Sequence, residues 1–216
     1  MKTLVYMMRH GESQGNASHS FLGHTDLPLT EKGRWQARAA SAYLAQIGFR
    51  PDVAYASPLC RAYETATLAL SYLPHLSVVP SEAMMEIYAG KWEGLFVKDI
   101  DALYPEELAV WRTDVGNSRP TEGETVRHLA ERVRGEVLRI AASHPGKTVF
   151  IGTHATPIRT FETLARGLTM DEAHQVRWPT NASLSGYLCE GDAVTPLFYS
   201  LDGYLQDVAD PSRIGL

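Results

Sequence analysis

Short apolar runs alternate along this chain with longer segments of helical periodicity. The first run, TLVYMM at residues 3–8, is apolar on both faces and partly β-branched, as is usual for a strand buried in a parallel sheet. Similar runs lie at 51–58, 76–81 and 147–155. Because strands that alternate with helices pair in parallel, the pattern predicts an α/β fold, with a mostly parallel central sheet and helices on both faces. The first helices are expected at 30–48 and 60–73, and a later one at about 157–167.

Local signals locate several further elements. Thr30 is a plausible N-cap for the Ala-rich helix that runs to Gly48, and Thr121 with Glu124 forms a capping-box pattern ahead of apolar residues at helical spacing. Residues 10–29 contain Gly, Asn, Ser, His and Pro28 without a period, so we expect a long loop, which is usually functional. The remaining predictions are short helical pieces near 97–103 and 105–114 and a closing pair of strands within 182–191 and 193–205.

The composition excludes several classes of protein. With 44% hydrophobic and 21% charged residues, and no repeat or linker, the chain is expected to form a single domain over residues 1–216. A net charge of −5 leaves no basic surplus for nucleic acid or for an anionic membrane surface. The start MKTLVYMM is too short for a signal peptide, and no apolar run is long enough to span a membrane, so we expect a cytoplasmic location.

The cysteines and histidines indicate neither a disulfide framework nor a metal site. Cys60 and Cys189 are far apart and form no C-x-x-C pair, and the spacing of His19 and His24 fits no helical face. We therefore expect no metal and no other cofactor. An anion would have to be bound by a local cluster of cationic side chains.

The stretch MMRHGESQGN at residues 7–16 is compatible with two kinds of chemistry. Its GESQG matches the G-x-S-x-G pattern of a serine hydrolase, with Ser13 as the nucleophile, whereas the preceding Arg-His pair offers His10 as a nucleophile toward phosphorus. A nucleophile elbow needs a helix directly after its turn and several strands ahead of it. Residues 16–28 have no helical pattern, and no strand precedes the run at 3–8. These features favour His10.

Basic and imidazole side chains follow three of the predicted strands. Arg9 and His10 end the first strand, Arg61 opens the helix after the second, and His154 follows the strand at 148–152. Because ligands of an open parallel sheet bind beyond the carboxyl ends of its strands, we expect these side chains to converge. Two guanidinium groups beside two imidazoles would form an anion site, and phosphate is its natural occupant because each guanidinium can bind it through two hydrogen bonds.

Several motifs in this order resemble those of the histidine phosphatase superfamily, also called the phosphoglycerate mutase-like family. They spread from residue 8 to about residue 160: RHGESQGN, FLGHTDLPLTEKG, ASPLCRAYETA, EIYAGKWEG and GTHATPIR. The resemblance implies a Rossmann-like three-layer α/β sandwich and metal-free phosphoryl transfer through a phosphohistidine. It also implies the site residues: His10 as the nucleophile, Glu86 as the proton donor, Arg9, Arg61 and His154 as the phosphate clamp, and Asn16 as a further phosphate contact.

The chemistry sets requirements for these residues. Phosphoryl transfer places negative charge on three oxygens, which Arg9, Arg61 and a protonated His154 can stabilise in place of Mg²⁺. His10 must be neutral at the attacking nitrogen, so its other ring nitrogen should donate to a backbone carbonyl or similar acceptor. Glu86 can protonate the leaving oxygen and then deprotonate the hydrolytic water.

Glu86 should lie in partly apolar surroundings, for which Trp92 and Tyr88 are candidate neighbours. The family commonly has Gly where this chain has Ala155, which leaves the backbone N–H in place. The predicted substrate contacts are Asn16, Phe21, Leu22, Gly23, Tyr88 and Ala155, with His24 and the aromatic stretch 86–111 as a possible roof over the site.

Phosphatase activity is favoured over mutase activity. Glycolytic mutases of the family have Trp at the position of Gly15 and a basic stretch after the acid, whereas EIYAGKWEG contains only Lys91 as a cation. We expect a phosphomonoesterase that acts on a small phosphorylated metabolite, such as a sugar phosphate, a nucleoside-type phosphate or phosphoglycerate. The alternatives are a phosphoglycerate mutase and, more remotely, a serine hydrolase using Ser13 or a non-catalytic phosphate-binding protein. The sequence does not indicate an oligomeric state.

Overall fold

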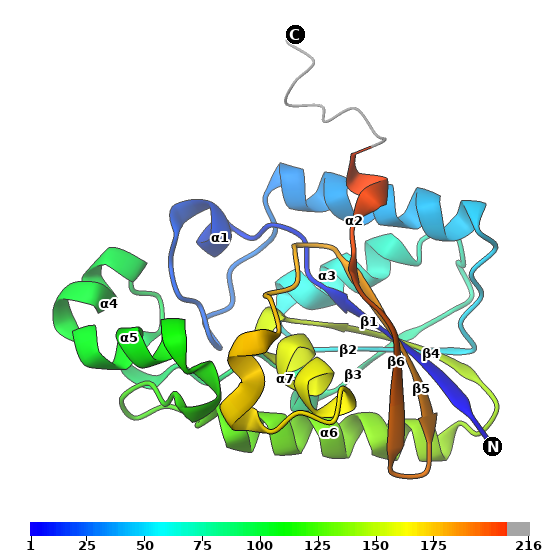
Figure 1. Cartoon of the computed structure of the whole chain (residues 1–216). Coiled ribbons are helices and arrows are strands. Elements are labelled where there is room, and N and C mark those ends of the chain that lie inside the picture. Colours follow the sequence, from blue (N-terminus) through cyan, green and yellow to red (C-terminus); the bar gives the residue numbers. More distant parts are fainter. Residues whose placement is uncertain (207–216) are drawn as a thin grey trace, which may run out of the picture.

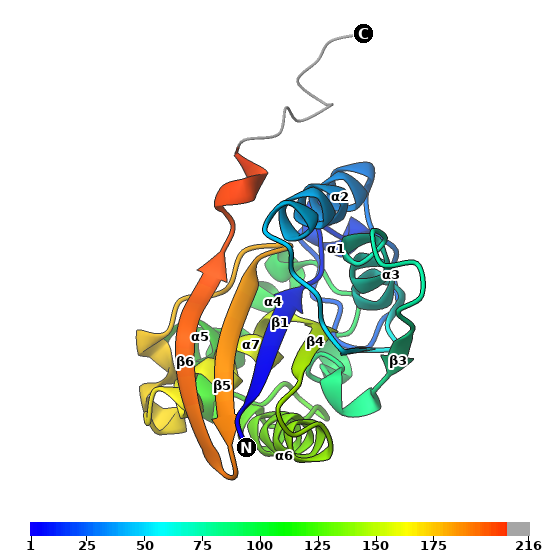
Figure 2. The same ribbon diagram turned by 90° about the vertical axis from the view of Figure 1, so that its right-hand side faces the viewer.

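A computed structural model describes residues 1–206, so residues 207–216 of the predicted domain lie outside the described part of the chain. Its centre is a six-stranded sheet with the order β3-β2-β4-β1-β5-β6. The strands are β1 (Thr3–Arg9), β2 (Val53–Ala56), β3 (Val78–Pro80), β4 (Thr148–Thr153), β5 (Leu184–Glu190) and β6 (Ala193–Leu201). β1 to β4 are mutually parallel, and β5 is antiparallel to both β1 and β6 (Figures 1 and 2). The predicted mostly parallel α/β sheet is confirmed.

Helices cover both faces of this sheet. α2 (Glu31–Gln46) and α3 (Cys60–Ala69) lie on one face, and α6 (Val126–Ser143) and α7 (Ala155–Ala165) lie on the other (Figures 1 and 2). β1 alternates between the two layers: Val5 and Met7 belong to the core with α6 and α7, and Met8 belongs to the core with α2 and α3. No helix among residues 1–206 has both the length and the apolar character needed to cross a bilayer.

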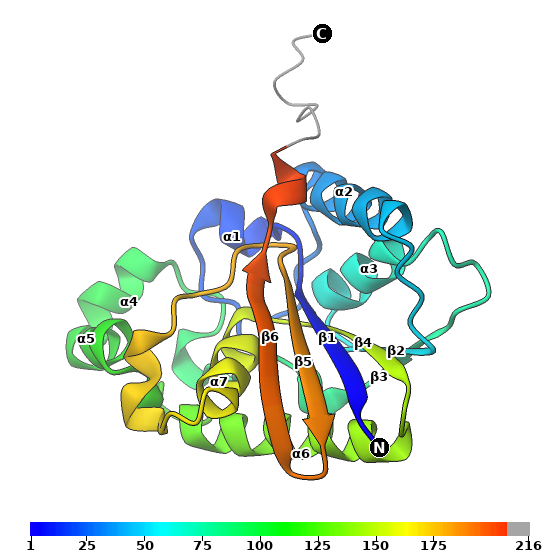
Figure 3. The ribbon, with the colours of Figure 1, turned by 45° about the vertical axis from the view of Figure 1, so that its right-hand side comes forward.

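A group of short elements lies beyond the carboxyl ends of β1 and β4, at the left of Figure 3. It comprises α1 (Gln14–Ser18), α4 (Val97–Leu103) and α5 (Pro105–Thr113). The short 3₁₀ helices η1 (Glu82–Met84) and η2 (Gly90–Trp92) precede α4, and η3 (Val115–Asn117) follows α5. η4 (Met170–Gln175) lies between α7 and β5, and η5 (Gly203–Leu205) follows β6. This group has a small core of its own around the fully buried Trp92. The sheet thus ends at a region of irregular chain, where functional residues are commonly found.

The N-terminal signals of two helices have different outcomes. Thr30 caps α2 as predicted, because its hydroxyl accepts a hydrogen bond from the N–H of Gly33. The predicted capping box of Thr121 and Glu124 is wrong, since α6 begins at Val126 and its N-cap is Thr125. The two predicted partners are engaged elsewhere: the Thr121 hydroxyl donates to Glu107, and Glu124 forms an ion pair with Arg132.

The predicted loop over residues 10–29 contains a helix. α1 follows Ser13 directly, and Ser13 with Asn16 forms a capping box that satisfies the N–H groups at its start. A five-residue helix is too short to show a hydrophobic period in the sequence. The expectation that no helix follows Ser13 is therefore wrong, and the choice between Ser13 and His10 depends on the geometry of the site.

Candidate active site

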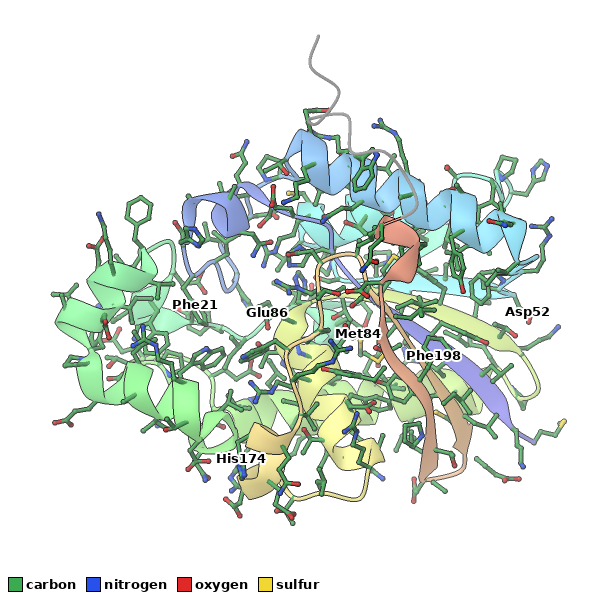
Figure 4. All side chains as sticks on the ribbon, turned by 45° about the horizontal axis from the view of Figure 1, so that its top comes forward. Phe21, Asp52, Met84, Glu86, His174 and Phe198 are labelled. Carbon is green, nitrogen blue, oxygen red and sulfur yellow. The ribbon has the colours of Figure 1, made fainter. Side chains whose placement is uncertain are left out.

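A cavity of about 270 Å³ lies at the carboxyl ends of β1 and β4. Most of the residues predicted from the sequence line it, and they come from the end of β1 and the loop after it, from α3, from the segment after η1 and from the start of α7. Figure 4 labels two of them, Glu86 near the centre of the molecule and Phe21 toward α4 and α5. The lining consists of Arg9, His10, Ser13, Asn16, Ser20, Phe21, Leu22, Gly23, Arg61, Glu86, Trp111, Ala155, Thr156 and Trp178.

His10 is fixed by its backbone and by one ring nitrogen. Its N–H donates to the carbonyl of Thr153 at 2.9 Å, which ties the end of β1 to the end of β4. Its Nδ1 lies 2.7 Å from the carbonyl oxygen of Gly11, and because a carbonyl only accepts, Nδ1 carries the proton. The predicted contact with a backbone carbonyl is confirmed. The other nitrogen, Nε2, therefore has a free lone pair.

The surroundings of His10 keep its ring neutral. The side chain is buried, and burial lowers its pKa well below the ordinary value, as do the positive charges of Arg61 and Arg9. A neutral imidazole with Nε2 unprotonated is the form of histidine that can act as a nucleophile.

Arg9 and Arg61 place positive charge beside His10. Nη1 of Arg9 donates to the carbonyl of Pro179 at 2.6 Å. Nη1 and Nη2 of Arg61 donate to the carbonyls of Thr25 at 2.9 Å and Gly23 at 2.7 Å. Within residues 1–206 neither guanidinium forms an ion pair with a carboxylate, although burial lowers the pKa of both. Arg61 is buried and Arg9 is half-buried, and cations that are held by carbonyls and form no ion pair with a carboxylate favour binding of an anion.

The imidazole ring of His154 lies next to that of His10. The two ring centroids are 5.2 Å apart, and Nε2 of His154 is 2.8 Å from the hydroxyl oxygen of Ser57. Its Nδ1 is buried and has no hydrogen-bond partner in the described part of the chain. Burial lowers the pKa of His154 well below its ordinary value, and the charge of Arg61 lowers it further. The ligand-free site thus favours a neutral His154, and the predicted protonated form concerns the site with a phosphoryl group bound.

Asn16 offers an amide N–H₂ group to the cavity. Its Oδ1 accepts hydrogen bonds from the N–H and the hydroxyl of Ser13 and from Nδ2 of Asn181, each at 3.1 Å. The Nδ2 of Asn181 also lies 3.1 Å from the carbonyl of His10, so Asn181 ties these two residues together. No local pattern in the sequence marks Asn181. Because the Asn16 oxygen faces these donors, its nitrogen is left to donate to a ligand.

Ser13 has the geometry of a helix cap. Its hydroxyl donates to Oδ1 of Asn16 and accepts from the N–H of Asn16 at 3.2 Å. Within residues 1–206 it has no hydrogen bond to a histidine or a carboxylate that could remove its proton. A serine nucleophile needs such a base, so the geometry favours His10.

Glu86 is the one carboxylate among the described residues that line the cavity. Its Oε1 accepts from the N–H of Ile87 at 2.9 Å, and its Oε2 is 3.5 Å from the N–H of Thr156 at the start of α7. The other acids of the loops are engaged elsewhere. Glu93 accepts from backbone N–H groups of the loop at His24, and Glu12 pairs with Lys32.

The predicted substrate contacts divide into two groups. Asn16, Phe21, Leu22, Gly23 and Ala155 line the cavity. Tyr88 does not: its ring lies 5.3 Å from that of His24, and both residues line a neighbouring surface hollow. Trp92 is fully buried against Phe21, so neither Trp92 nor Tyr88 lines the cavity beside Glu86. The prediction of Tyr88 as a substrate contact is therefore not supported by the geometry.

Arg132 on α6 is a further residue that the sequence did not reveal. Its guanidinium donates to the carbonyls of Ala83, Met85 and Glu86 and to both carboxylate oxygens of Glu124. The carbonyl of Glu86 also lies 2.9 Å from Nε2 of His24. The backbone that presents Glu86 is therefore held from two sides, and Arg132 is a positioning residue.

We expect the fold to lose stability between pH 7 and pH 5 through His10 and His154. Both folded-state pKa values lie below the ordinary value of about 6.5, so the unfolded chain binds more protons in this range. The free energy of unfolding must then fall as the pH drops below about 6.5. Thermal unfolding in phosphate-free buffer measures the effect. The His10→Asn/His154→Asn variant should show a smaller decrease in Tm than the parent, whereas His19→Asn, an exposed control, should keep the full decrease. Equal decreases in all three proteins would contradict this interpretation.

The chain resembles known proteins in both sequence and fold. Residues 5–201 match the family described as the histidine phosphatase superfamily (branch 1). The chain is 36% identical over 161 residues, 72% of each chain, to 2,3-bisphosphoglycerate-dependent phosphoglycerate mutase 2 of Gloeobacter violaceus. It is 29% identical over 168 residues, 78% of each chain, to phosphoserine phosphatase 1 of Hydrogenobacter thermophilus. A mycobacterial glucosyl-3-phosphoglycerate phosphatase, solved in complex with VO3, superposes with a TM-score of 0.82 and 27% identity, over 92% of this chain and 98% of that one.

Proposed function

The chain belongs to the histidine phosphatase superfamily, and we propose that it hydrolyses phosphomonoesters of small metabolites through a phosphohistidine at His10. The observation that carries the proposal is the neutral His10, with Nδ1 bound to the Gly11 carbonyl, beside the buried Arg61 and the half-buried Arg9, neither of which forms an ion pair with a carboxylate within residues 1–206. Arg9 and Arg61 would hold the phosphoryl oxygens, and Nδ2 of Asn16 would donate a further hydrogen bond.

In the first step Nε2 of His10 attacks phosphorus, and the P–O bond to the leaving oxygen breaks. Its electron pair goes to the leaving oxygen, which takes the proton held by Glu86 and departs as an alcohol. A phosphoryl group bound at His10 would place negative charge close to His154. The Nδ1 of His154, which has no hydrogen-bond partner in the described part of the chain, would then donate to it. The two arginines supply the positive charge that stabilises the transition state, which is the role that Mg²⁺ has in many phosphoryl-transfer enzymes.

In the second step water attacks the phosphohistidine. The carboxylate of Glu86 takes the proton of the water, the P–N bond breaks, and its electron pair returns to Nε2 of His10. Inorganic phosphate leaves, and Glu86 is again protonated. The same residue thus acts first as acid and then as base.

Hydrolysis is better supported than phosphoglycerate mutase activity. A mutase must hold a substrate that carries a second anion, but Arg9 and Arg61 are the only lysine or arginine side chains among the described residues that line the cavity. Lys91 lies outside it and pairs with Glu122. The Trp that mutases carry at the position of Gly15 has no room here, because a Cβ at that position would lie 2.4 Å from the Leu22 side chain. Water therefore meets less competition for the phosphohistidine.

An assay of the chelated enzyme tests the proposal. The protein is treated exhaustively with EDTA and offered a panel of phosphomonoesters, with phosphate release and interconversion of 2- and 3-phosphoglycerate followed in parallel. We expect phosphate release that persists after chelation, inhibition by vanadate, and mutase turnover at least about tenfold slower than hydrolysis, because the missing contacts to a second anion are charge-assisted. Faster mutase turnover would contradict the phosphatase function. Activity that returns only with Mg²⁺ or Zn²⁺ would contradict the arginine-based mechanism.

Substitution of Arg132 tests how Glu86 is positioned. Arg132→Lys keeps the charge but cannot reach three carbonyls and Glu124 together, so we expect kcat on an alkyl phosphate to fall roughly 10- to 100-fold. The loss on p-nitrophenyl phosphate should be smaller, because that leaving group hardly needs a proton. Arg139→Lys on the same helix is the matched control, since the one ion pair of Arg139 in the described part of the chain is with Glu136. A uniform loss on both substrates would indicate general damage to the fold.

A further inference from the structure

An uncharged and largely aromatic group of lining residues forms one wall of the cavity. Phe21, Trp111 and Trp178 contribute three rings to it, and Leu22 contributes a buried aliphatic side chain. The rings come from the loop after α1, from α5 and from the segment after η4, so the fold assembles this wall from parts of the chain that are far apart (Figure 1).

The three rings hold each other in place. Phe21 meets Trp111 edge to face, with centroids 5.0 Å apart, and Trp111 stacks on Trp178 at 5.5 Å with an interplanar angle of 22°. The guanidinium of Arg159 lies 4.1 Å from the centroid of Trp178 and donates to the carbonyl of Ala173, which fixes the second tryptophan. The wall is therefore ordered before a ligand arrives, which lowers the entropic cost of binding.

Core packing accounts for Phe21 and Trp111, which pack against buried core residues, but Trp178 belongs to no core cluster among the described residues. Trp92 in the small core is fully buried, whereas Trp178, which lines the cavity, is 37% exposed. Burial of the exposed apolar surface of a tryptophan ring is favourable in free energy, and this contribution is missing while the ring is in contact with water. A ligand that covers the ring would recover that free energy.

The charges of the cavity limit what such a ligand can carry. Arg9 and Arg61 are engaged by the phosphoryl group in the proposed function, and Glu86 is acidic. Arg159 is buried behind Trp178 and is not part of the lining. A carboxylate or second phosphate on the leaving group would therefore face aromatic rings and an acid, with no cation among the described lining residues to pair with it.

We propose that the leaving group of the natural substrate is an uncharged alcohol that carries an aromatic ring, and that this ring packs against the wall that Phe21, Trp111 and Trp178 form together. The inference rests on the proposed function, because the phosphoryl group must sit at His10 for the leaving group to reach the wall. It makes O-phosphoserine and phosphoglycerate poor substrates, and it favours arylalkyl and nucleoside-type phosphates.

Matched esters test the proposal. Ethyl phosphate, 2-phenylethyl phosphate and O-phosphoserine all release a primary alcohol, so differences in kcat/KM report chiefly on binding of the rest of the molecule. We expect 2-phenylethyl phosphate to exceed ethyl phosphate by roughly 10- to 100-fold, the effect of burying one ring on an aromatic wall. O-phosphoserine should be no better than ethyl phosphate.

Variants locate the effect. Trp111→Leu and Trp178→Leu should bring the ratio of the two kcat/KM values toward one, and Trp178→Phe should keep most of it. Tyr63→Leu on α3 is the control, because Tyr63 is equally exposed, at 37%, and does not line the cavity. If a tryptophan variant does not fold, calorimetric titration of His10→Ala with the same three esters gives the preference directly, since no turnover interferes.

The outcomes separate the two proposals. Equal kcat/KM values for the ethyl and phenylethyl esters, or a preference for O-phosphoserine, would overturn the inference about the aromatic leaving group. Release of phosphate from ethyl phosphate would still support the phosphatase function. An unchanged ratio in both tryptophan→Leu variants would overturn it as well. Failure to release phosphate from any ester would contradict the proposed function itself, and the calorimetric titration would then still decide which ester the cavity prefers.

Discussion

His10→Ala is expected to reduce kcat/KM for every phosphomonoester by on the order of 10⁴-fold or more, because it removes the atom to which the phosphoryl group is transferred. Ser13→Ala should cost much less, about tenfold at most. The Ser13 hydroxyl caps α1 and contacts Asn16, and loss of an N-cap costs about 1 kcal/mol of stability. Steady-state kinetics on p-nitrophenyl phosphate measure both variants.

Two controls make this comparison decisive. Thermal unfolding checks that both variants fold, and a fluorophosphonate probe reports on any activated serine. The probe would label Ser13 of the parent protein if the serine hydrolase hypothesis were correct. Such labelling, together with loss of activity in Ser13→Ala but not in His10→Ala, would contradict the assignment of His10 as the nucleophile.

Glu86→Gln is expected to slow formation of the phosphohistidine from an alkyl phosphate by about 10²- to 10⁴-fold, the usual contribution of a general acid. Glutamine keeps the size of the side chain and its acceptor oxygen, but it has no proton to give. An alkoxide is a poor leaving group and needs that proton, whereas p-nitrophenolate is stable without it. The loss on p-nitrophenyl phosphate should therefore be much smaller.

The measurement must isolate the first step, because Glu86 also acts on water in the second. Single-turnover rapid-quench kinetics with excess enzyme provide it. Glu82→Gln is a matched control, because Glu82 is an exposed acid four residues away that lines the neighbouring hollow and not the cavity. Equal losses on the two substrates in Glu86→Gln would remove Glu86 from the role of acid.

The strand-end argument predicted much of the site because it depends on topology alone. Arg9 and Thr153 are register partners in the parallel pair β1 and β4, so the residues that follow them, His10 and His154, must lie side by side. Arg61 joins them because α3 begins just after β2, which pairs with the other edge of β4. The short buried strands and the helix N-cap at Thr30 could also be predicted, because each depends on residues that are adjacent in the sequence.

Contacts between distant segments could not be predicted. Trp178 reaches the cavity from the segment before β5, and Arg132 reaches the backbone of Glu86 from the middle of an amphipathic helix, where it has the pattern of an ordinary surface residue. The charge state of His154 was also beyond the sequence, since it follows from complete burial and from the distance to other charges. The short helix α1 was missed because its signal is a capping box and not a hydrophobic period.

The central claim is that the phosphoryl group passes through His10, and trapping the phosphoenzyme tests it most directly. The enzyme is mixed with a ³²P-labelled phosphomonoester, quenched in alkali during turnover, digested, and analysed by mass spectrometry under alkaline conditions. The mechanism predicts a phosphoryl group on His10 that is stable in alkali, is lost in acid, and is absent from His10→Ala. An acid-stable phosphoryl group on another residue, or full turnover with no phosphoenzyme at any quench time, would contradict it.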